Sequence, residues 1–100
     1  MDLNEITNRL SKVSDIYADK FNIRRDDDWF VLKIQEELGE LSAAHLKLTQ
    51  RARIGENSQA DLNKNLQDEI ADVIAITLLF ARHRGVDIQK AIEEKWFKYL

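Results

Sequence analysis

Apolar residues recur along the chain at intervals of three and four positions, which is the period of one face of an α-helix. The pattern predicts four helices, over about Leu3–Lys20, Trp29–Arg51, Leu62–Arg84 and Ile88–Tyr99. The first connection ends in three aspartates, Asp26–Asp28, one of which can cap the second helix. Gly55–Asp61 has the composition of a loop. Gly85 is expected to end the third helix, and Asp87 to cap the fourth.

The same periodicity predicts which positions face inward. In the first helix these positions are Ile6, Leu10, Val13 and Tyr17. In the second they are Leu32 (or Val31), Ile34, Leu38, Leu41, Ala44 and Leu48. In the third they are Leu66, Ile70, Val73, Ile74, Thr77, Leu78 and Ala81.

Composition supports an all-α fold, because the 100 residues include no proline and only three glycines. We expect a single domain over residues 1–100, of the four-helix bundle type. The third helix is apolar around more than half of its circumference, and such a helix is usually buried from several sides. A chain of this size has few elements to supply those sides. The helices are therefore expected to pack further across a subunit interface, in a homodimer or homotetramer.

Composition and charge also exclude several classes of protein. Without cysteine the chain has no disulfide, no catalytic thiolate and no cysteine-ligated zinc. Its longest apolar stretches are too short to cross a bilayer and no secretory leader opens it, so we expect a cytoplasmic protein with no membrane contact. The formal net charge of −3 argues against binding to a nucleic-acid polymer.

Two acidic windows interrupt the amphipathic pattern. Glu36, Glu37 and Glu40 share one face of the second predicted helix, and Glu69 and Asp72 share one face of the third. Like charges at this spacing repel each other, by about 0.2–0.5 kcal/mol per exposed pair. The sequence leaves two interpretations open. One is a solvated acidic surface with no further role, and the other is a site for a hard divalent cation such as Mg²⁺ or Mn²⁺.

The histidines argue against other kinds of site. A di-iron bundle needs a Glu-x-x-His pattern on two helices, but the positions three after Glu37 and Glu69 are acidic. His83 is interpreted as a cation at a helix end, and His45 as an ordinary, partly exposed residue. No Ser–His–acid or Cys–His set supports a nucleophilic side chain.

At these acidic residues the sequence resembles the MazG family of all-α nucleoside triphosphate pyrophosphohydrolases. The family signature is Glu-Glu-x-x-Glu on one helix and Glu-x-x-Asp on a later one, as in Glu36–Glu40 and Glu69–Asp72 here. Gly85–Asp87 resembles the family's turn before the last helix, and Glu94–Lys98 resembles that basic helix. The similarity covers roughly Trp29–Leu100.

The resemblance implies Mg²⁺-dependent hydrolysis, with Mn²⁺ as a substitute, between the α and β phosphates of a nucleoside or deoxynucleoside triphosphate. The products would be the monophosphate and pyrophosphate, in a role such as nucleotide-pool housekeeping. The resemblance assigns Glu37, Glu40, Glu69 and Asp72 as metal ligands, and Glu36 as a further ligand or the base that positions the attacking water. It also implies a site completed at a subunit interface.

Substrate contacts are less clearly marked in the sequence. Lys95 and Lys98 match basic positions of the family's last helix and are candidates for phosphate binding, although Tyr99 replaces a polar residue common there. Lys33 could bind phosphate or form an ion pair with the glutamates. Trp29 and Trp96 could stack on a base or pack in the protein interior. The alternative function is a non-catalytic helical module that presents its acidic face to a partner or binds nucleotide without cleaving it.

Overall fold

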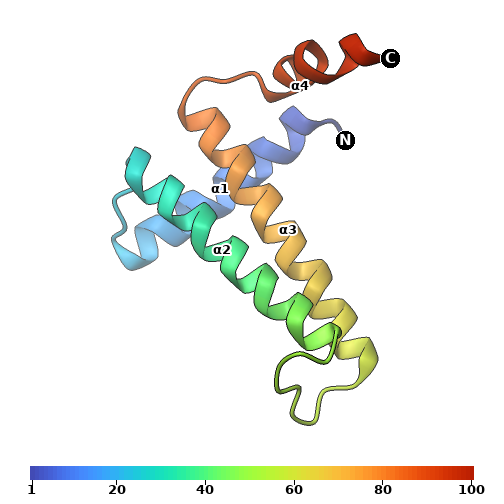
Figure 1. Ribbon diagram of the computed structural model, residues 1–100. Helices are drawn as coiled ribbons and strands as arrows, with labels where there is room; N and C mark the ends of the chain where they lie inside the picture. Colours follow the sequence, from blue (N-terminus) through green and yellow to red (C-terminus); the bar gives the residue numbers. More distant parts are fainter.

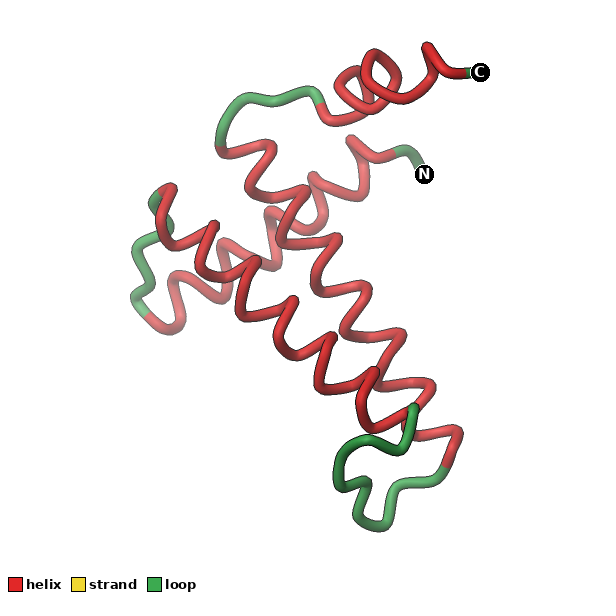
Figure 2. Tube along the Cα trace, in the orientation of Figure 1, coloured by secondary structure: helices red, strands yellow, loops and turns green.

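The computed structural model describes residues 1–100 and confirms the all-α fold (Figures 1 and 2). It contains no strand. The helices are α1 (Leu3–Phe21), α2 (Asp27–Leu48), α3 (Gln59–His83) and α4 (Ile88–Trp96), followed by a 3₁₀ turn, η1 (Phe97–Tyr99). No helix is both long enough and apolar enough to span a membrane.

The helix ends follow from local capping. Asp26 begins α2, since its side chain accepts a hydrogen bond of 2.8 Å from the backbone N–H of Trp29. Asp87 caps α4 in the same way, as expected. Gly85 follows the end of α3 with φ of 67°, a left-handed conformation that suits glycine. The second helix ends at Leu48, earlier than its periodicity predicts.

The start of α3 differs from the prediction for a physical reason. Gly55–Asp61 was expected to be a loop throughout, but its last three residues are helical. The Ser58 side chain accepts a hydrogen bond from the backbone N–H of Asp61, and the Asp61 carboxylate accepts one from the backbone N–H of Ser58. This reciprocal capping box satisfies two helix-end donors, and the backbone hydrogen bond lowers the pKa of Asp61.

The capping box gives a first prediction. Replacing Ser58 with alanine is expected to reduce the free energy of unfolding by about 1 kcal/mol, the usual effect of losing such a cap. Ser42 lies within α2, where its hydroxyl bonds only to the preceding turn. Ser42→Ala is therefore the matched control, and urea denaturation of both variants measures the difference. Equal losses in the two variants would contradict the role given to the box.

Three of the helices form the packed part of the molecule. In Figure 1, α2 and α3 run side by side and antiparallel, and α1 crosses behind them at the C-terminal half of α3. Phe30 of α2 is buried at this crossing, with its ring 6.0 Å from that of Phe80 and 4.8 Å from that of His83. The last helix, α4, extends away from the pair and packs closely only with η1.

Several residues expected to face inward are exposed in the single chain. The first helix packs through small residues such as Thr7 and Ala18, while Val13 on its apolar stripe is 65% exposed. Only eight of the 100 residues are buried, because α1 covers only one end of the α2–α3 pair. The expected core positions that are exposed are Ile6, Val13, Tyr17, Val31, Leu32, Leu38, Ile70, Ile74 and Thr77.

Candidate metal centre

Four carboxylates converge where α2 and α3 run side by side. Glu37 and Glu40 come from α2, and Glu69 and Asp72 come from α3. Each residue contributes one oxygen atom to a group whose members all lie within 4.8 Å of one another. The spacing of three within each pair places both carboxylates on one face of their helix, and antiparallel packing brings the two faces together. These are the four residues to which the family resemblance assigns metal binding.

The environment of the group divides it into an inner and an outer pair. Glu37 and Glu69 are partly buried, whereas Glu40 and Asp72 are exposed. One carboxylate oxygen of each inner residue, Oε2, is shielded from solvent and has no hydrogen-bond partner. A buried acceptor without a partner is unfavourable, by about 1–3 kcal/mol for a neutral group and more for a charged one. These two oxygens lack a positively charged partner.

The inner carboxylates also have perturbed acidity. Burial raises the pKa of Glu37 above its ordinary value, and the neighbouring charges of Glu40 and Asp72 raise it further. The pKa of Glu69 is raised for the same reasons in the same order. Both shifts mean that the folded chain holds these two negative charges at a cost when no cation is present.

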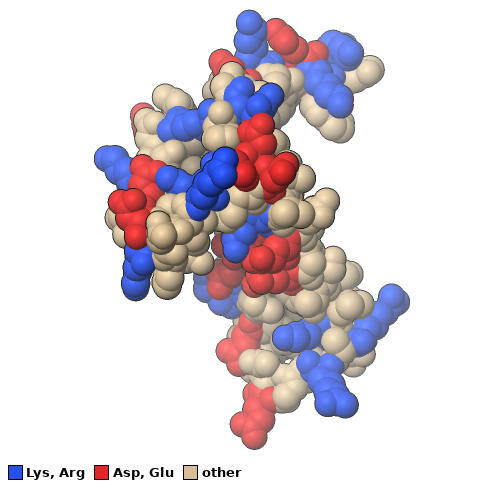
Figure 3. All heavy atoms as spheres, turned by 90° about the vertical axis from the view of Figure 1, so that its left-hand side faces the viewer, with Lys and Arg blue, Asp and Glu red and all other residues tan.

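The group fits a divalent cation. Its donors are all carboxylate oxygens, the ligand type of hard ions, and a cation among them would both neutralise the repulsion and satisfy the two buried oxygens. The four residues can therefore hold a metal ion. Acidic side chains gather about midway along one face of the molecule, as Figure 3 shows, with basic side chains above and below them.

Glu36 lies outside this group of four. Its carboxylate accepts a hydrogen bond of 2.8 Å from the ammonium of Lys33, one turn earlier on α2. This ion pair raises the pKa of Lys33. Two roles were predicted for Lys33, phosphate binding and an ion pair with the glutamates, and the structure shows the ion pair. Glu36 is exposed, so water can reach its carboxylate.

The other predicted substrate contacts are not assembled within one chain. Trp29 is partly buried with its ring edge-on to Phe30, at 5.0 Å between centroids. Lys95 belongs to α4 and Lys98 to η1, and neither element packs closely on the helices that carry the carboxylates. Trp96 is 64% exposed on the same projecting segment.

Sequence reasoning missed a polar contact between the ends of α2 and α3. Asp27 accepts a hydrogen bond of 2.9 Å from Arg84 Nη1 and is 2.9 Å from His83 Nε2. His83 was expected only to lie at a helix end, but it also contacts Asp27 and the Phe30 ring. No local sequence signal predicts this contact, because the residues are more than 50 positions apart. It joins the first turn of α2 to the end of α3.

Comparison with known proteins agrees with the acidic motifs. The model of the MazG-like family matches residues 32–100, which include all four converging carboxylates. No curated protein and no solved structure shows a significant match to the chain. A family match over more than half of the chain, together with the all-α fold, is sufficient to assign the family. This chain belongs to the MazG-like family.

Proposed function

We propose that the protein is a metal-dependent nucleoside triphosphate pyrophosphohydrolase, cleaving an NTP or dNTP to the monophosphate and pyrophosphate. The observation that carries the proposal is the convergence of four carboxylates within 4.8 Å, with two buried oxygens that have no partner. Membership of the MazG-like family supports activity of this type. Nucleotide-pool housekeeping is the role that we propose for it.

The proposed chemistry depends on a charge argument. A triphosphate is strongly anionic, so an acidic group accepts it only through bridging cations. Bound Mg²⁺, or Mn²⁺ in its place, would polarise the phosphoryl oxygens and lower the pKa of a coordinated water. Glu37, Glu40, Glu69 and Asp72 are the proposed ligands.

The chain's own residues then position water and substrate. Glu36 is the proposed base or additional ligand, because it directly precedes Glu37 in the chain and is exposed to water. Lys33 holds the Glu36 carboxylate in place through their ion pair. Trp29 remains a candidate for stacking on the base. Lys95 and Lys98 project on the C-terminal segment, so we propose that they meet phosphate only when a second copy is present.

A second copy of the chain is proposed on the basis of exposed area. A compact protein of 11.7 kDa exposes about 5,900 Å². This chain exposes 7781 Å², roughly 1,900 Å² more. Its radius of gyration is 16.0 Å, against about 13 Å for a compact 100-residue domain. The excess exceeds the ~800 Å² that each partner contributes to a standard interface, which supports a homodimer or homotetramer.

The apolar stripe of α1 offers a direct test of this assembly. Val13→Glu places a charge among exposed apolar side chains and is expected to shift the protein to monomers. Lys12→Glu changes the neighbouring exposed position to the same residue and is expected to leave the assembly intact. Light scattering after gel filtration measures both. A wild-type protein that stays monomeric at every concentration would contradict the proposal.

One experiment tests the activity and separates it from the alternatives. The protein is incubated with a panel of NTPs and dNTPs and Mg²⁺, and both the melting temperature and pyrophosphate release are followed. A hydrolase gives a thermal shift and pyrophosphate, since a ligand bound only by the folded state raises its stability. A shift without pyrophosphate indicates nucleotide binding without cleavage. If the protein shows neither a thermal shift nor pyrophosphate release, it is a module that uses its acidic face for another partner.

A further inference from the structure

A small basic hollow lies between α1, α3 and the connection that precedes α2. Its volume is about 200 Å³, below the ~300–1,000 Å³ of pockets that enclose drug-sized ligands. It is therefore sized for an ion or a small group. Most of the residues that line it are polar or charged, and two are apolar. The lining residues are Ser11, Ser14, Arg25, Phe30, Leu79, Arg82 and His83.

The charged groups that line the hollow are two guanidinium groups. One imidazole lines it as well, and no carboxylate does. Arg25 donates one hydrogen bond to Ser14 and one to Asp15, at 2.8 Å each. Asp15 and Asp27, which pair with Arg25 and His83, lie outside the lining. Two carboxylates thus partly offset the basic residues around the hollow.

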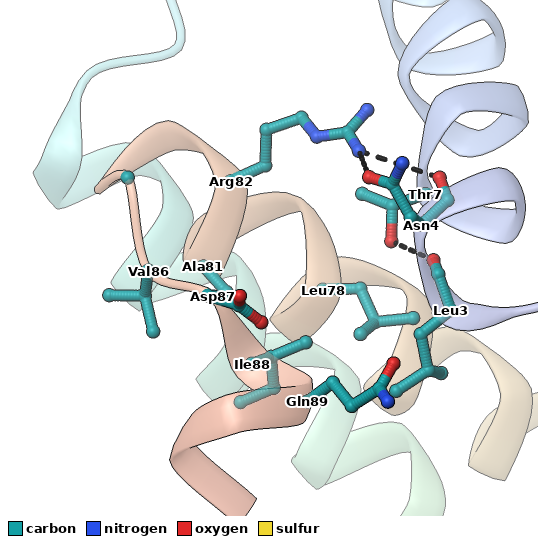
Figure 4. Close-up of a pocket in the computed structure, with 11 residues that line it drawn as sticks. Leu3, Asn4, Thr7, Leu78, Ala81, Arg82, Val86, Asp87, Ile88 and Gln89 are labelled. Carbon is teal, nitrogen blue, oxygen red and sulfur yellow. Dashed lines mark hydrogen bonds between the residues drawn. The ribbon is translucent and has the colours of Figure 1, made fainter.

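Arg82 is the residue whose charge is not offset. Its guanidinium donates hydrogen bonds of 2.6 Å to the Asn8 side chain and 2.9 Å to the Asn4 side chain, and it has no carboxylate partner. Figure 4 shows Arg82 reaching from α3 across to Asn4 of α1. Neutral amides orient the guanidinium without cancelling its charge. A guanidinium has five N–H groups, so Arg82 keeps donors for a further acceptor.

We propose that this hollow binds a tetrahedral oxyanion of the phosphate class, either inorganic phosphate or one phosphate of pyrophosphate. Guanidinium groups match phosphate oxygens in geometry and form charge-assisted hydrogen bonds with them. The two serine hydroxyls can donate to the remaining oxygens. An anion here would hold α1, α3 and the Arg25 segment together.

This site is separate from the carboxylate group. Phe30 precedes Glu37 by seven residues on α2, and Leu79 follows Asp72 by seven on α3. At 1.5 Å per residue this places the hollow about 10 Å along the helices from the carboxylates. Anion binding at this hollow needs no divalent cation and does not rest on the proposed hydrolase activity.

The larger hollow of about 520 Å³ between α1, α3 and α4 is a weaker candidate for an anion. Arg82 also lines it, but Asp87 faces it as well (Figure 4). The Asp87 carboxylate opposes the positive charge of Arg82 in this hollow. The smaller hollow has two guanidinium groups and no carboxylate in its lining, so it is the better site.

The test uses the full chain with a chelator and without divalent cations, so that the carboxylates cannot recruit phosphate through a metal. Inorganic phosphate and pyrophosphate are titrated by calorimetry at constant ionic strength set with chloride. We expect saturable binding in the millimolar range or tighter. Equal affinity for the two ions identifies a single-phosphate site, and tighter pyrophosphate binding identifies the diphosphate as the ligand.

Variants locate the binding. Arg25→Gln and Arg82→Gln are expected to weaken it about tenfold or more, as for loss of a charge-assisted hydrogen bond. Ser14→Ala should weaken it a few-fold and leaves the Arg82 link between α1 and α3 intact. Arg53→Gln, at an exposed loop position, is the matched control and should bind as the wild type does. Absence of saturable binding, or equal weakening in Arg25→Gln and Arg53→Gln, would overturn the proposal.

Discussion

Replacing Glu69 with glutamine is expected to stabilise the metal-free protein and, at the same time, to remove most of its metal-dependent pyrophosphate release. Glutamine keeps the size of the side chain but removes one negative charge from a group of four within 4.8 Å. It also removes a partly buried carboxylate whose Oε2 has no partner. The repulsion that opposes folding falls, and one proposed metal ligand is lost.

The two effects have different sizes and different readouts. Stability should rise by up to about 1 kcal/mol, or roughly 4–8 °C in melting temperature for a domain of this size. Pyrophosphate release should fall by about 10²–10³-fold, the usual effect of removing one electrostatic stabiliser of a transition state. Asp72→Asn is expected to lower activity similarly, with less effect on stability because Asp72 is exposed.

Asp68 provides the matched control for this prediction. It precedes Glu69 directly, is exposed, and pairs with Lys64 at 2.6 Å, outside the group of four. Asp68→Asn should therefore leave activity unchanged and reduce stability slightly if at all, since exposed ion pairs contribute little. Full activity in Glu69→Gln would remove the basis for the metal assignment. Activity lost together with the helical circular dichroism signal would contradict the expected gain in stability.

The second large effect is on how stability depends on pH, because the sign of this dependence differs with and without metal. The folded chain raises the pKa values of Glu37 and Glu69 above 4.5, so between 4.5 and those raised values the folded state binds more protons than the unfolded state. The contribution of these two groups to stability is therefore complete below pH 4.5 and is lost as pH rises through the raised values. The metal-free protein should therefore lack this contribution to its stability at pH values above the raised pKa values.

A bound cation reverses this trend, because it requires the carboxylates in their ionised form. Stabilisation by Mg²⁺ or Mn²⁺ should grow as pH rises through the same window, reaching about 2.7 kcal/mol at an ion concentration 100 times its dissociation constant. Urea denaturation at a series of pH values, with chelator or with metal, measures both curves at one fixed protein concentration.

The Glu37→Gln/Glu69→Gln double variant isolates these groups from the other carboxylates of the chain. Its metal-free stability should lack the loss above pH 4.5 that the wild type shows, and metal should stabilise it little at any pH. Identical pH profiles for the double variant and the wild type would show that the two inner carboxylates do not respond to burial as described.

The sequence was sufficient to predict the elements and the acidic group. Helical periodicity and the scarcity of glycine and proline gave four helices, and aspartate caps placed the starts of α2 and α4 closely. The i, i+3 spacing of Glu37 and Glu40, and of Glu69 and Asp72, places each pair on one helix face by geometry alone. Antiparallel neighbouring helices then bring the two pairs together. The helices, their caps and the pairing of carboxylates on one face depend on local chain geometry, which short stretches of sequence encode. The convergence of the two pairs also requires the packing of α2 against α3.

Other features depended on how the helices pack. Periodicity identifies an apolar face but not what covers it, so Val13 and Ile74 were expected inside and are exposed in the single chain. Likewise, only the crossing of α1 with α3 brings Arg82 to Asn4 and Asn8, more than 70 positions away in the sequence. The contact between Asp27 and His83 and the basic hollow arise in the same way. Contacts between distant residues depend on helix crossing angles and register, which no single helical pattern specifies.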